Sequence, residues 1–318
     1  MKELTTEIKA LQEETLKNLQ SAKAYNTVRA YKSDFEDFTL FCVKNAFKNL
    51  PSEPRVVSLY LTYLSSKDVK ISTIKRRLVS ISVIHKMKGH YLDTKHPIIM
   101  ENLMGIKRRK GTIQIGKKPL LINNLKQVID VINNQNDPDL KKLRNKAILL
   151  IGFSGGFRRN EIVSLDIEDI EFVFEGVKIK IKKSKTDQYG EGTIKGIPHF
   201  ENSFYCPVTN LKRWINTSKI KKGPIFVKFS KGSKITEQRL TDQSIALIIK
   251  EYLLKAGIDS KNYSGHSLRS GFATSAAEAG AEERSIMKMT GHKSTEMVRR
   301  YIKEASLFKN NALSKVKF

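Results

Sequence analysis

Cysteine is nearly absent from this 318-residue chain, whose only two cysteines, Cys42 and Cys206, lie far apart in the sequence. Neither belongs to a Cys-x-x-Cys pair, and no cluster of histidines accompanies them. The sequence therefore offers neither a disulfide framework nor a zinc site, and we expect no metal in the protein.

Long apolar runs are also missing. No stretch approaches the roughly 20 apolar residues that a membrane-spanning helix requires. The N-terminal residues MKELTTEIKALQEE carry charges of both signs and lack the apolar core of a signal peptide. We therefore expect a cytoplasmic protein without a membrane partner.

Acidic residues are outnumbered, because 32 Asp and Glu face 58 Lys and Arg, which gives a formal net charge of +26 at pH 7. Residues 1–110 carry 21 basic and 11 acidic side chains, and residues 111–318 carry 37 and 21. Both halves are thus basic, with net charges of +10 and +16. A polyanion that contacts both halves is the expected partner, and nucleic acid fits best. An anionic membrane surface is the alternative, but no long apolar helix with a basic face supports it.

The length predicts two domains, each large enough for its own core. Residues 1–20 form a short amphipathic arm in this interpretation, and residues 21–108 form a helical domain. Its helices are expected from Tyr25 onward, over 56–64, from a cap at Ser72-Thr73 and over 98–106. Apolar residues of the first helix recur at steps of three and four, as on one helical face. They are Val28, Tyr31, Phe35, Phe38 and Cys42.

Basic side chains decorate the third of these helices and the segment after the fourth. Charges of this kind are commonly a solvated helix face, but in so basic a chain they are equally candidates for contact with DNA phosphates. The candidates are Lys75, Arg76, Arg77, Lys86, Lys88, Lys107, Arg108 and Arg109. The basic, aperiodic run from Lys107 to Pro119 contains the expected interdomain linker, which we place at residues 109–119.

The second domain, residues 120–318, mixes helices with a small sheet. Helical patterns cover 122–133, 138–153 and 242–256, whereas Val177, Ile179 and Ile181 alternate with lysines as in a half-exposed strand. Turn residues at Glu175-Gly176 and at Gly190–Gly192 indicate hairpins on either side. The fold class predicted for the whole chain is mainly α with a small antiparallel β-sheet.

One run, from Gly265 to Tyr301, carries the chemistry. His266 and Arg269 are three residues apart and share a helical face near a helix N-terminus, where an anion is favoured. A Gly-His pair at His292 and then Tyr301 follow. Each of these residues alone is most simply a packed or solvated side chain, but the ordered set predicts a phosphate site.

This run resembles the C-terminal signature of the tyrosine recombinases, His-x-x-Arg, then Gly-His, then Tyr. Its flanking residues are similar to those of phage integrases and of the Cre subgroup, although Cre has tryptophan where this chain has His292. The family's upstream Gly-apolar-Arg-x-x-Glu box matches here with Arg158 and Glu161, and its hairpin lysine matches Lys185 in Ser-Lys-Thr. The resemblance covers nearly the whole chain, as a helical core-binding (SAM-like) domain followed by an α+β catalytic domain.

The resemblance implies a site-specific integrase or resolvase that cuts DNA through a 3′-phosphotyrosyl ester on Tyr301. A tyrosine phenol, with a reference pKa near 10, needs a base or cations beside it to attack a phosphate. Arg158 and Arg269 would hold the nonbridging oxygens, and Lys185 would protonate the leaving oxygen. His266 and His292 would accept a proton and a hydrogen bond, and Glu161 would orient a neighbour. No nucleotide or metal cofactor is needed.

Double-stranded DNA and further copies of the chain are the partners that the resemblance implies, as a four-protomer synapse associated with the nucleoid. The tail after Tyr301 is too short to form a stable helix alone and needs an apolar groove. The resemblance implies a groove on a neighbouring subunit, and packing on its own domain is the alternative. The apolar residues of the tail are Leu307, Phe308, Leu313 and Val316. A type IB topoisomerase and a catalytically silent DNA-binding regulator remain the alternatives. The sequence points to no particular accessory protein.

Overall fold

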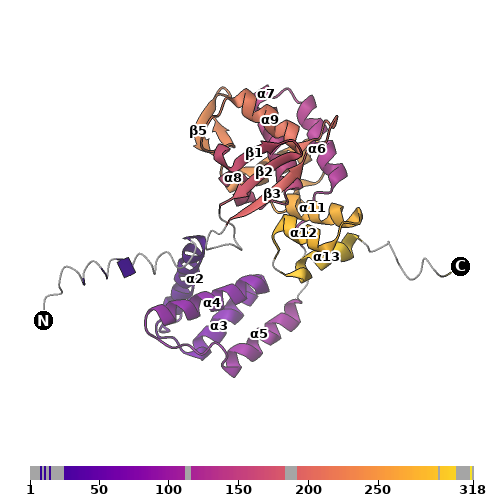
Figure 1. The fold of residues 1–318 in the computed structure, drawn as a ribbon. Coiled ribbons are helices and arrows are strands. Elements are labelled where there is room, and N and C mark those ends of the chain that lie inside the picture. Colours follow the sequence, from indigo (N-terminus) through magenta and orange to yellow (C-terminus); the bar gives the residue numbers. More distant parts are fainter. Residues whose placement is uncertain are drawn as a thin grey trace. The chain divides into compact units, whose positions relative to one another are not determined.

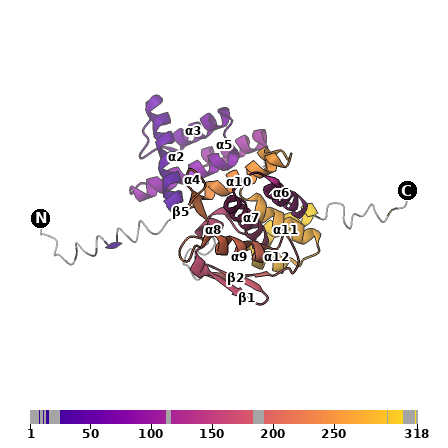
Figure 2. The same cartoon turned by 90° about the horizontal axis from the view of Figure 1, so that it is seen from above.

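The computed structural model describes residues 25–111, 116–182, 192–292 and 294–305, together with residues 8, 11, 14, 15 and 316. The chain divides into two compact units, Met1–Ile115 and Gly116–Phe318 (Figures 1 and 2). Most of the expected N-terminal arm lies outside the described residues, as do Lys185 and the tail residues Leu307, Phe308 and Leu313.

The described part of the first unit consists of four helices. They are α2 (Tyr25–Lys44), α3 (Pro54–Ser66), α4 (Ile71–Met87) and α5 (Pro97–Lys110). Helix α2 packs on α4 and α3 packs on α5, around a core in which Phe38, Tyr60 and Ile81 are fully buried. The predicted apolar stripe of the first helix is confirmed at Phe38 and Cys42, which face this core.

Two predicted boundaries in this unit are wrong. Helix α4 begins at Ile71, before the expected cap at Ser72-Thr73, because Ile71 already packs against the core. Helix α5 continues through Lys110, so Arg109 and Lys110, at the start of the expected linker, are helical. Buried Ile106 commits this turn to the core, and Lys110 pairs with Asp68 at 2.8 Å, which extends the helix to Gly111.

The second unit begins with three helices, continues through two small sheets, and ends with helices. The first helices are α6 (Ile122–Asn134), α7 (Asp139–Ser154) and α8 (Arg159–Ser164). The 3-10 helix Ile167–Asp169 leads into β1 (Ile170–Val173), β2 (Gly176–Ile181) and β3 (Thr193–Pro198), which form an antiparallel sheet in this order. Next come α9 (Pro207–Ser218) and the antiparallel pair β4 (Val227–Phe229) and β5 (Ile235–Arg239).

The remaining helices complete this unit. They are α10 (Asp242–Lys255), the 3-10 helix Ser260–Asn262, α11 (Ser267–Glu278), α12 (Glu283–Thr290) and α13 (Thr295–Ala305). The predicted class, mainly α with a small antiparallel sheet, is confirmed, although the β4–β5 hairpin was not anticipated. No helix in the described part of the chain is long and apolar enough to cross a membrane.

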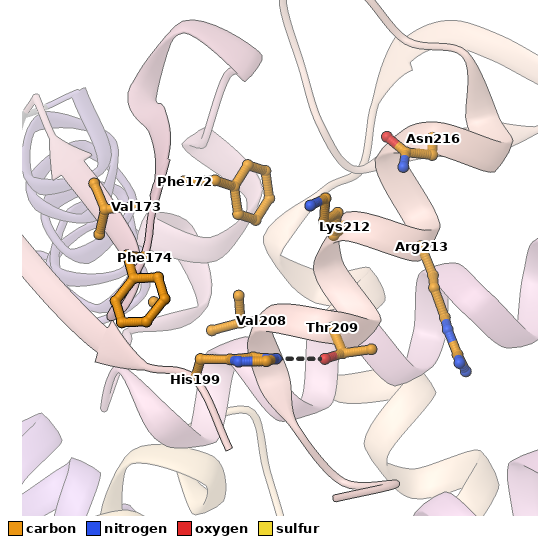
Figure 3. Close-up of a pocket in the computed structure, with 10 residues that line it drawn as sticks. Phe172, Val173, Phe174, His199, Val208, Thr209, Lys212, Arg213 and Asn216 are labelled. Atoms are coloured by element: carbon orange, nitrogen blue, oxygen red, sulfur yellow. Dashed lines mark hydrogen bonds between the residues drawn. The ribbon is translucent and has the colours of Figure 1, made fainter. Parts of the chain in front are cut away.

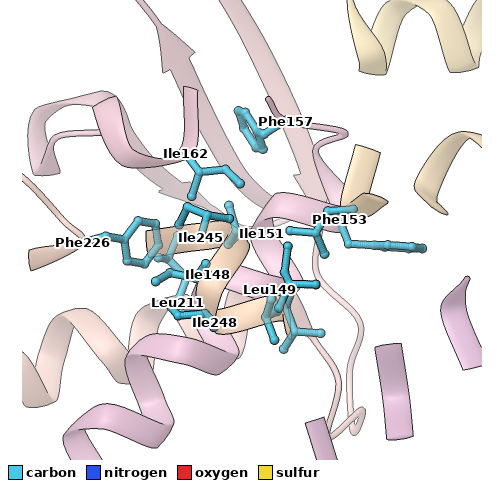
Figure 4. Packing of buried hydrophobic residues seen from close by; sticks show 14 of the residues in the cluster. Ile148, Leu149, Ile151, Phe153, Phe157, Ile162, Leu211, Phe226, Ile245 and Ile248 are labelled. Carbon is cyan, nitrogen blue, oxygen red and sulfur yellow. The ribbon is translucent and has the colours of Figure 1, made fainter. Parts of the chain in front are cut away.

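Helix α7 runs through the middle of the second core. Ile148, Leu149 and Ile151 on successive faces of this helix are fully buried, because α9, α10, α11 and α6 all pack against it. A helix that is apolar on every side must be enclosed in this way. Figure 4 shows these residues among Phe153, Phe157, Ile162, Leu211, Phe226, Ile245 and Ile248.

The predicted alternation of β2 is also confirmed. Val177, Ile179 and Ile181 face the core, and Lys178 and Lys180 are exposed. Ile179 lies opposite Lys195 of β3, and Lys180 lies opposite Ile194. Strand β3 therefore lies next to β2, whose three buried apolar residues determine which face of the sheet points toward the core.

Candidate active site

The turn between α7 and α8 positions the first arginine. Gly156 adopts a positive φ of 55°, which glycine tolerates without strain, and the chain reverses there. Arg158 then caps α8, and buried Glu161 accepts hydrogen bonds from both the Arg158 backbone N (2.9 Å) and its Nη1 (2.6 Å). This capping box fixes the guanidinium at the start of the helix, with the orienting contact from Glu161 that the sequence led us to expect.

Arg269 lies one turn into α11 and is fully buried. Its Nη1 donates to the Gly156 carbonyl oxygen at 2.9 Å, whereas its Nε and Nη2 have no hydrogen-bond partner among the residues that the structure describes. Burial and, to a smaller extent, the nearby charge of Arg158 lower the pKa of Arg269 to about 10, against the opposing effects of Glu161 and Tyr301. Buried donors without partners are rare and costly. This arginine is therefore built to receive an acceptor, and an anion would supply both acceptor and countercharge.

His292 follows α12, which ends at Gly291 in the left-handed conformation. The Thr290 hydroxyl donates to the Ile286 carbonyl oxygen at 2.7 Å, so the 2.7 Å contact between Thr290 Oγ1 and His292 Nδ1 requires the ring nitrogen to be the donor. This arrangement assigns the proton of the neutral ring to Nδ1 and leaves Nε2 as an acceptor.

Burial and the surrounding positive charge both favour the neutral form of His292. Burial lowers its pKa to about 4, and the positive charges of Arg269, Arg158, His266 and Lys195 act in the same direction. A neutral imidazole with a free lone pair can accept a proton from a nearby hydroxyl.

Tyr301 lies on α13 and is only 8% exposed. It packs with Ala273 of α11, Ile286 of α12 and Val298 of its own helix. Its ring centroid lies 6.1 Å from that of His292, and its charge, when ionised, would be felt by Arg269. The packing of α11, α12 and α13 thus brings the two ends of the signature run together, as seen in the yellow part of Figure 1.

Among the predicted active-site residues, His266 differs from Arg269 in its exposure to solvent. It is exposed, immediately before α11 begins at Ser267, and its charge acts on His292. Lys185 lies outside the described residues, so its expected role stays a prediction.

Two residues of this cluster were not anticipated from the sequence. Thr290 adjoins the Gly-His pair, but only the helical geometry of α12 shows its contact with His292. Lys195 of β3 is 4% exposed and belongs to the same group of charges. Side chains two residues apart in a strand point to the same face, so inward-facing Ile197 could have indicated from the sequence that Lys195 also points inward.

The basic residues proposed for DNA contact in the first unit fall into two groups. Arg76 pairs with Asp34 at 2.5 Å, and Arg77 donates to Asp37 and, at 2.7 Å, to the Tyr60 hydroxyl. These contacts tie α4 to α2 and α3, so Arg77 serves the fold. The other group is exposed, and its members remain candidates for phosphate contact: Lys75, Lys86, Lys88, Lys107, Arg108 and Arg109.

A pocket of about 430 Å³ lies elsewhere in the second unit, between the β1–β2 hairpin and α9 (Figure 3). None of the predicted active-site residues lines it, and the His199 ring contacts the Thr209 hydroxyl there at 3.1 Å. Its walls are Phe172, Val173, Phe174, Gly176, His199, Val208, Thr209, Lys212, Arg213 and Asn216.

Comparisons with known proteins identify the family and similar folds. Residues 120–307 match the phage integrase family. The chain is 38% identical over 303 residues to an integrase/recombinase xerD homolog from Selenomonas ruminantium, over 94% of this chain and 88% of that protein. Its fold is similar to that of a XerH site-specific recombinase bound to palindromic difH substrate, with a TM-score of 0.62, 18% identity, and coverage of 83% of this chain and 71% of that chain. A lambda integrase dimer bound to a COC′ core site gives a TM-score of 0.60, 14% identity, and coverage of 91% and 75%.

The cluster brings two arginines, a neutral histidine and a buried tyrosine together within one unit. The family match spans more than half of the chain, and the chain belongs to the phage integrase family. Its activity is that of a tyrosine recombinase, the cleavage and rejoining of DNA strands. The expected likeness to the Cre subgroup stays a prediction.

Proposed function

We propose that this tyrosine recombinase acts at specific DNA sites and that Tyr301 is its nucleophile. The observation that carries the assignment is the pair of donors on buried Arg269 that have no partner within the described part of the chain, next to Arg158, His292 and Tyr301. A DNA phosphate offers two nonbridging oxygens and a negative charge, which together match these donors. The family match favours a recombinase over a type IB topoisomerase or a silent regulator.

In the proposed reaction the Tyr301 oxygen attacks the scissile phosphorus, and the bond from phosphorus to the 5′ oxygen breaks. The phenolic proton passes to Nε2 of His292, and the departing 5′ oxygen takes a proton from Lys185. The products are a 3′-phosphotyrosyl ester and a free 5′-hydroxyl, so the reverse reaction can rejoin a strand without an external energy source.

The remaining residues stabilise the charge on the phosphate. Arg158 and Arg269 donate to its nonbridging oxygens, held by Glu161 and by the Gly156 carbonyl respectively. His266 adds a donor at the start of α11, where the helix dipole also favours an anion. Because these donors are fixed before the substrate arrives, they need little reorganisation in the transition state.

The proposed partner is double-stranded DNA, contacted by both basic halves of the chain, with four protomers in the recombining complex. The two similar structures are a XerH recombinase bound to palindromic difH substrate and a lambda integrase dimer bound to a COC′ core site, which supports DNA and a further protomer as partners. Action on chromosomal sites would place the protein at the nucleoid.

The nucleophile can be tested with a nicked suicide substrate that traps the covalent intermediate. The purified protein should form a 3′-phosphotyrosyl adduct at Tyr301 without added metal, identified by mass spectrometry of the peptide. Tyr301→Phe should bind the same DNA and form no adduct. Adduct formation by Tyr301→Phe, or a strict need for Mg²⁺, would remove Tyr301 from this role.

A further inference from the structure

The strand β3 places a lysine inside the protein and an isoleucine outside. Lys195 is 4% exposed, whereas its neighbour Ile194 is 66% exposed. The inward face is fixed by Ile197 and by the pairing of Lys195 with buried Ile179 of β2. Lysine is seldom buried in this way without a carboxylate partner. Among the described residues no carboxylate lies within 4.0 Å of Lys195 Nζ, so the burial needs another reason.

The contacts of this ammonium group point to the turn that carries Arg158. Lys195 Nζ donates to the Gly155 carbonyl oxygen at 2.6 Å and lies 4.5 Å from the centroid of the buried Phe157 ring. The next carbonyl, that of Gly156, accepts from Arg269. Two successive carbonyls of one turn therefore bind two buried cations, from β3 and from α11.

The same ammonium group shares the electrostatics of the catalytic cluster. Burial lowers the pKa of Lys195 to about 8, Glu161 opposes this effect, and Arg269 and Arg158 add to it. In return, Lys195 is one of the cations that lower the pKa of His292. An apolar side chain of similar length would fill the space at a lower desolvation cost than an ammonium group. The hydrogen-bond donor and the positive charge are therefore the features of Lys195 that matter to the site.

We propose that Lys195 is a positioning residue for strand cleavage, which acts through the Gly155–Phe157 turn to place Arg158 and Arg269 around the phosphate. The inference rests on the proposed function of that phosphate site. Lys195 does not protonate the leaving group, a role that remains with Lys185. Its charge also helps to keep His292 in the neutral form that accepts the phenolic proton.

The test compares Lys195→Met and Lys195→Arg in single-turnover cleavage of the suicide substrate by the full-length protein. Lys195→Met should cleave about 100-fold more slowly, as displaced catalytic groups do, with DNA affinity nearly unchanged. Lys195→Arg should recover part of the rate, because a guanidinium can still donate to the Gly155 carbonyl. Lys180→Met, which removes an exposed lysine from the neighbouring strand, is the matched control and should cleave at the normal rate.

A pH profile separates positioning from simple loss of folded protein. Removing the positive charge of Lys195 should raise the pKa of His292, so the acidic limb of the cleavage profile should move to higher pH in Lys195→Met. The other charged groups in this setting, retained in the variant, are Arg158, Glu161, Arg269 and His266. If Lys195→Met shows a lower burst amplitude of cleavage but an unchanged acidic limb in the pH profile, the lysine only supports the fold. If Lys195→Met does not fold, the same limb should move in Lys195→Gln.

A 5′-phosphorothiolate substrate, whose sulfur leaves without protonation, completes the test. It should restore cleavage by Lys185→Ala but not by Lys195→Met. Restoration in Lys195→Met would make Lys195 the general acid and overturn the positioning role, as would a normal cleavage rate in that variant on the ordinary substrate. If the unmodified protein forms no tyrosyl adduct, the proposed function fails instead, independently of Lys195.

Discussion

Arg269 shows how one residue can be both a structural and a functional centre. Its Nη1 is committed to the Gly156 carbonyl, which joins α11 to the α7–α8 turn, and its other donors are left for a ligand. Full burial excludes water, which would otherwise compete for these donors and weaken their effect on a phosphate. In the proposed reaction, the phosphate would offset the free-energy cost of burying this unbalanced charge.

The two arginines should therefore matter for chemistry more than for binding. Arg158→Ala and Arg269→Ala should each slow single-turnover cleavage by about 100- to 1,000-fold, the effect of losing one oxyanion donor. DNA affinity should change little, because many other basic residues contact the backbone. Cleavage rates and gel-shift titrations on the same DNA would measure both. An equal loss in affinity and rate would show that these arginines serve ground-state binding.

His292 gives a prediction for stability against pH. Its pKa is about 4 in the folded protein, compared with an ordinary value near 6.5 in an unfolded chain. Between these values the unfolded chain binds more protons, so stability is fully present above pH 6.5 and falls as the pH drops toward 4. His292→Gln should lose this part of the pH dependence.

Urea midpoints measured from pH 4 to 8 would show the difference between the two proteins. His85, whose pKa is also lowered by burial, is present in both and cancels in the comparison. Parallel curves for the variant and the unmodified protein would contradict a neutral, buried His292.

At the scale of elements, α11 assembles the site. It packs against α7, α12, α13 and α6, and it carries Arg269 toward the α7–α8 turn. The segment that leads into α6 lies directly against it, since Leu120 N donates to the Ser267 carbonyl at 2.9 Å. A side chain on the facing position, Gly271, would occupy the space of the Leu120 backbone: a Cβ there would lie 1.9 Å from the Leu120 carbonyl oxygen.

Two helical glycines should consequently respond to alanine in opposite ways. Gly271→Ala should destabilise the protein by roughly 1–3 kcal/mol, because rigid backbone must move to admit the methyl group. Gly105→Ala in α5, where nothing lies within 4 Å of the new Cβ, should stabilise it by about 0.5–1 kcal/mol through helix propensity. Thermal unfolding of both variants would test the pair. A neutral Gly271→Ala would mean that the α11 packing is looser than this contact implies.

Sequence periodicity predicted the elements well where one face is apolar. The stripe of α2, the alternation of β2 and the enclosed run of α7 each identify the type of element, because burial dictates those patterns. Exact ends escaped prediction where a tertiary contact decides them, as Lys110 with Asp68 does for α5. The β4–β5 hairpin lacks a strong alternation, since the residues of its second strand are partly buried or exposed without a period of two.

The active site could be predicted from the sequence only where its residues follow a local spacing. The signature residues could be named from their order and spacing, but their supports depend on contacts between distant segments. Lys195 reaches a carbonyl 40 residues away in the sequence, and Arg269 reaches one 113 residues away. No local pattern encodes such pairs. Arg77 is a further case, because its contacts with Asp37 and Tyr60 join three helices and no local pattern in the sequence indicates them.

At the scale of the whole molecule, positive charge is spread over both units. The boundary at Ile115 and Gly116 separates two independent cores, one built on α2 to α5 and the other around α7. With net charges of +10 on residues 1–110 and +16 on residues 111–318, neither unit holds the excess alone. Each is expected to displace its own counterions when it binds DNA, and the two contributions to the salt dependence should add.

A cut between Ile115 and Gly116 would test this division, because each fragment retains the core described for it. Circular dichroism would first establish that both fragments fold. Each should then bind the target DNA more weakly than the intact protein, with a shallower slope of log affinity against log salt, since each neutralises fewer phosphates. Adding the two slopes should approach the slope of the intact chain. If either fragment alone reproduces the full affinity and slope, the other unit does not contact the DNA backbone, and its basic residues serve solubility or protein contacts instead.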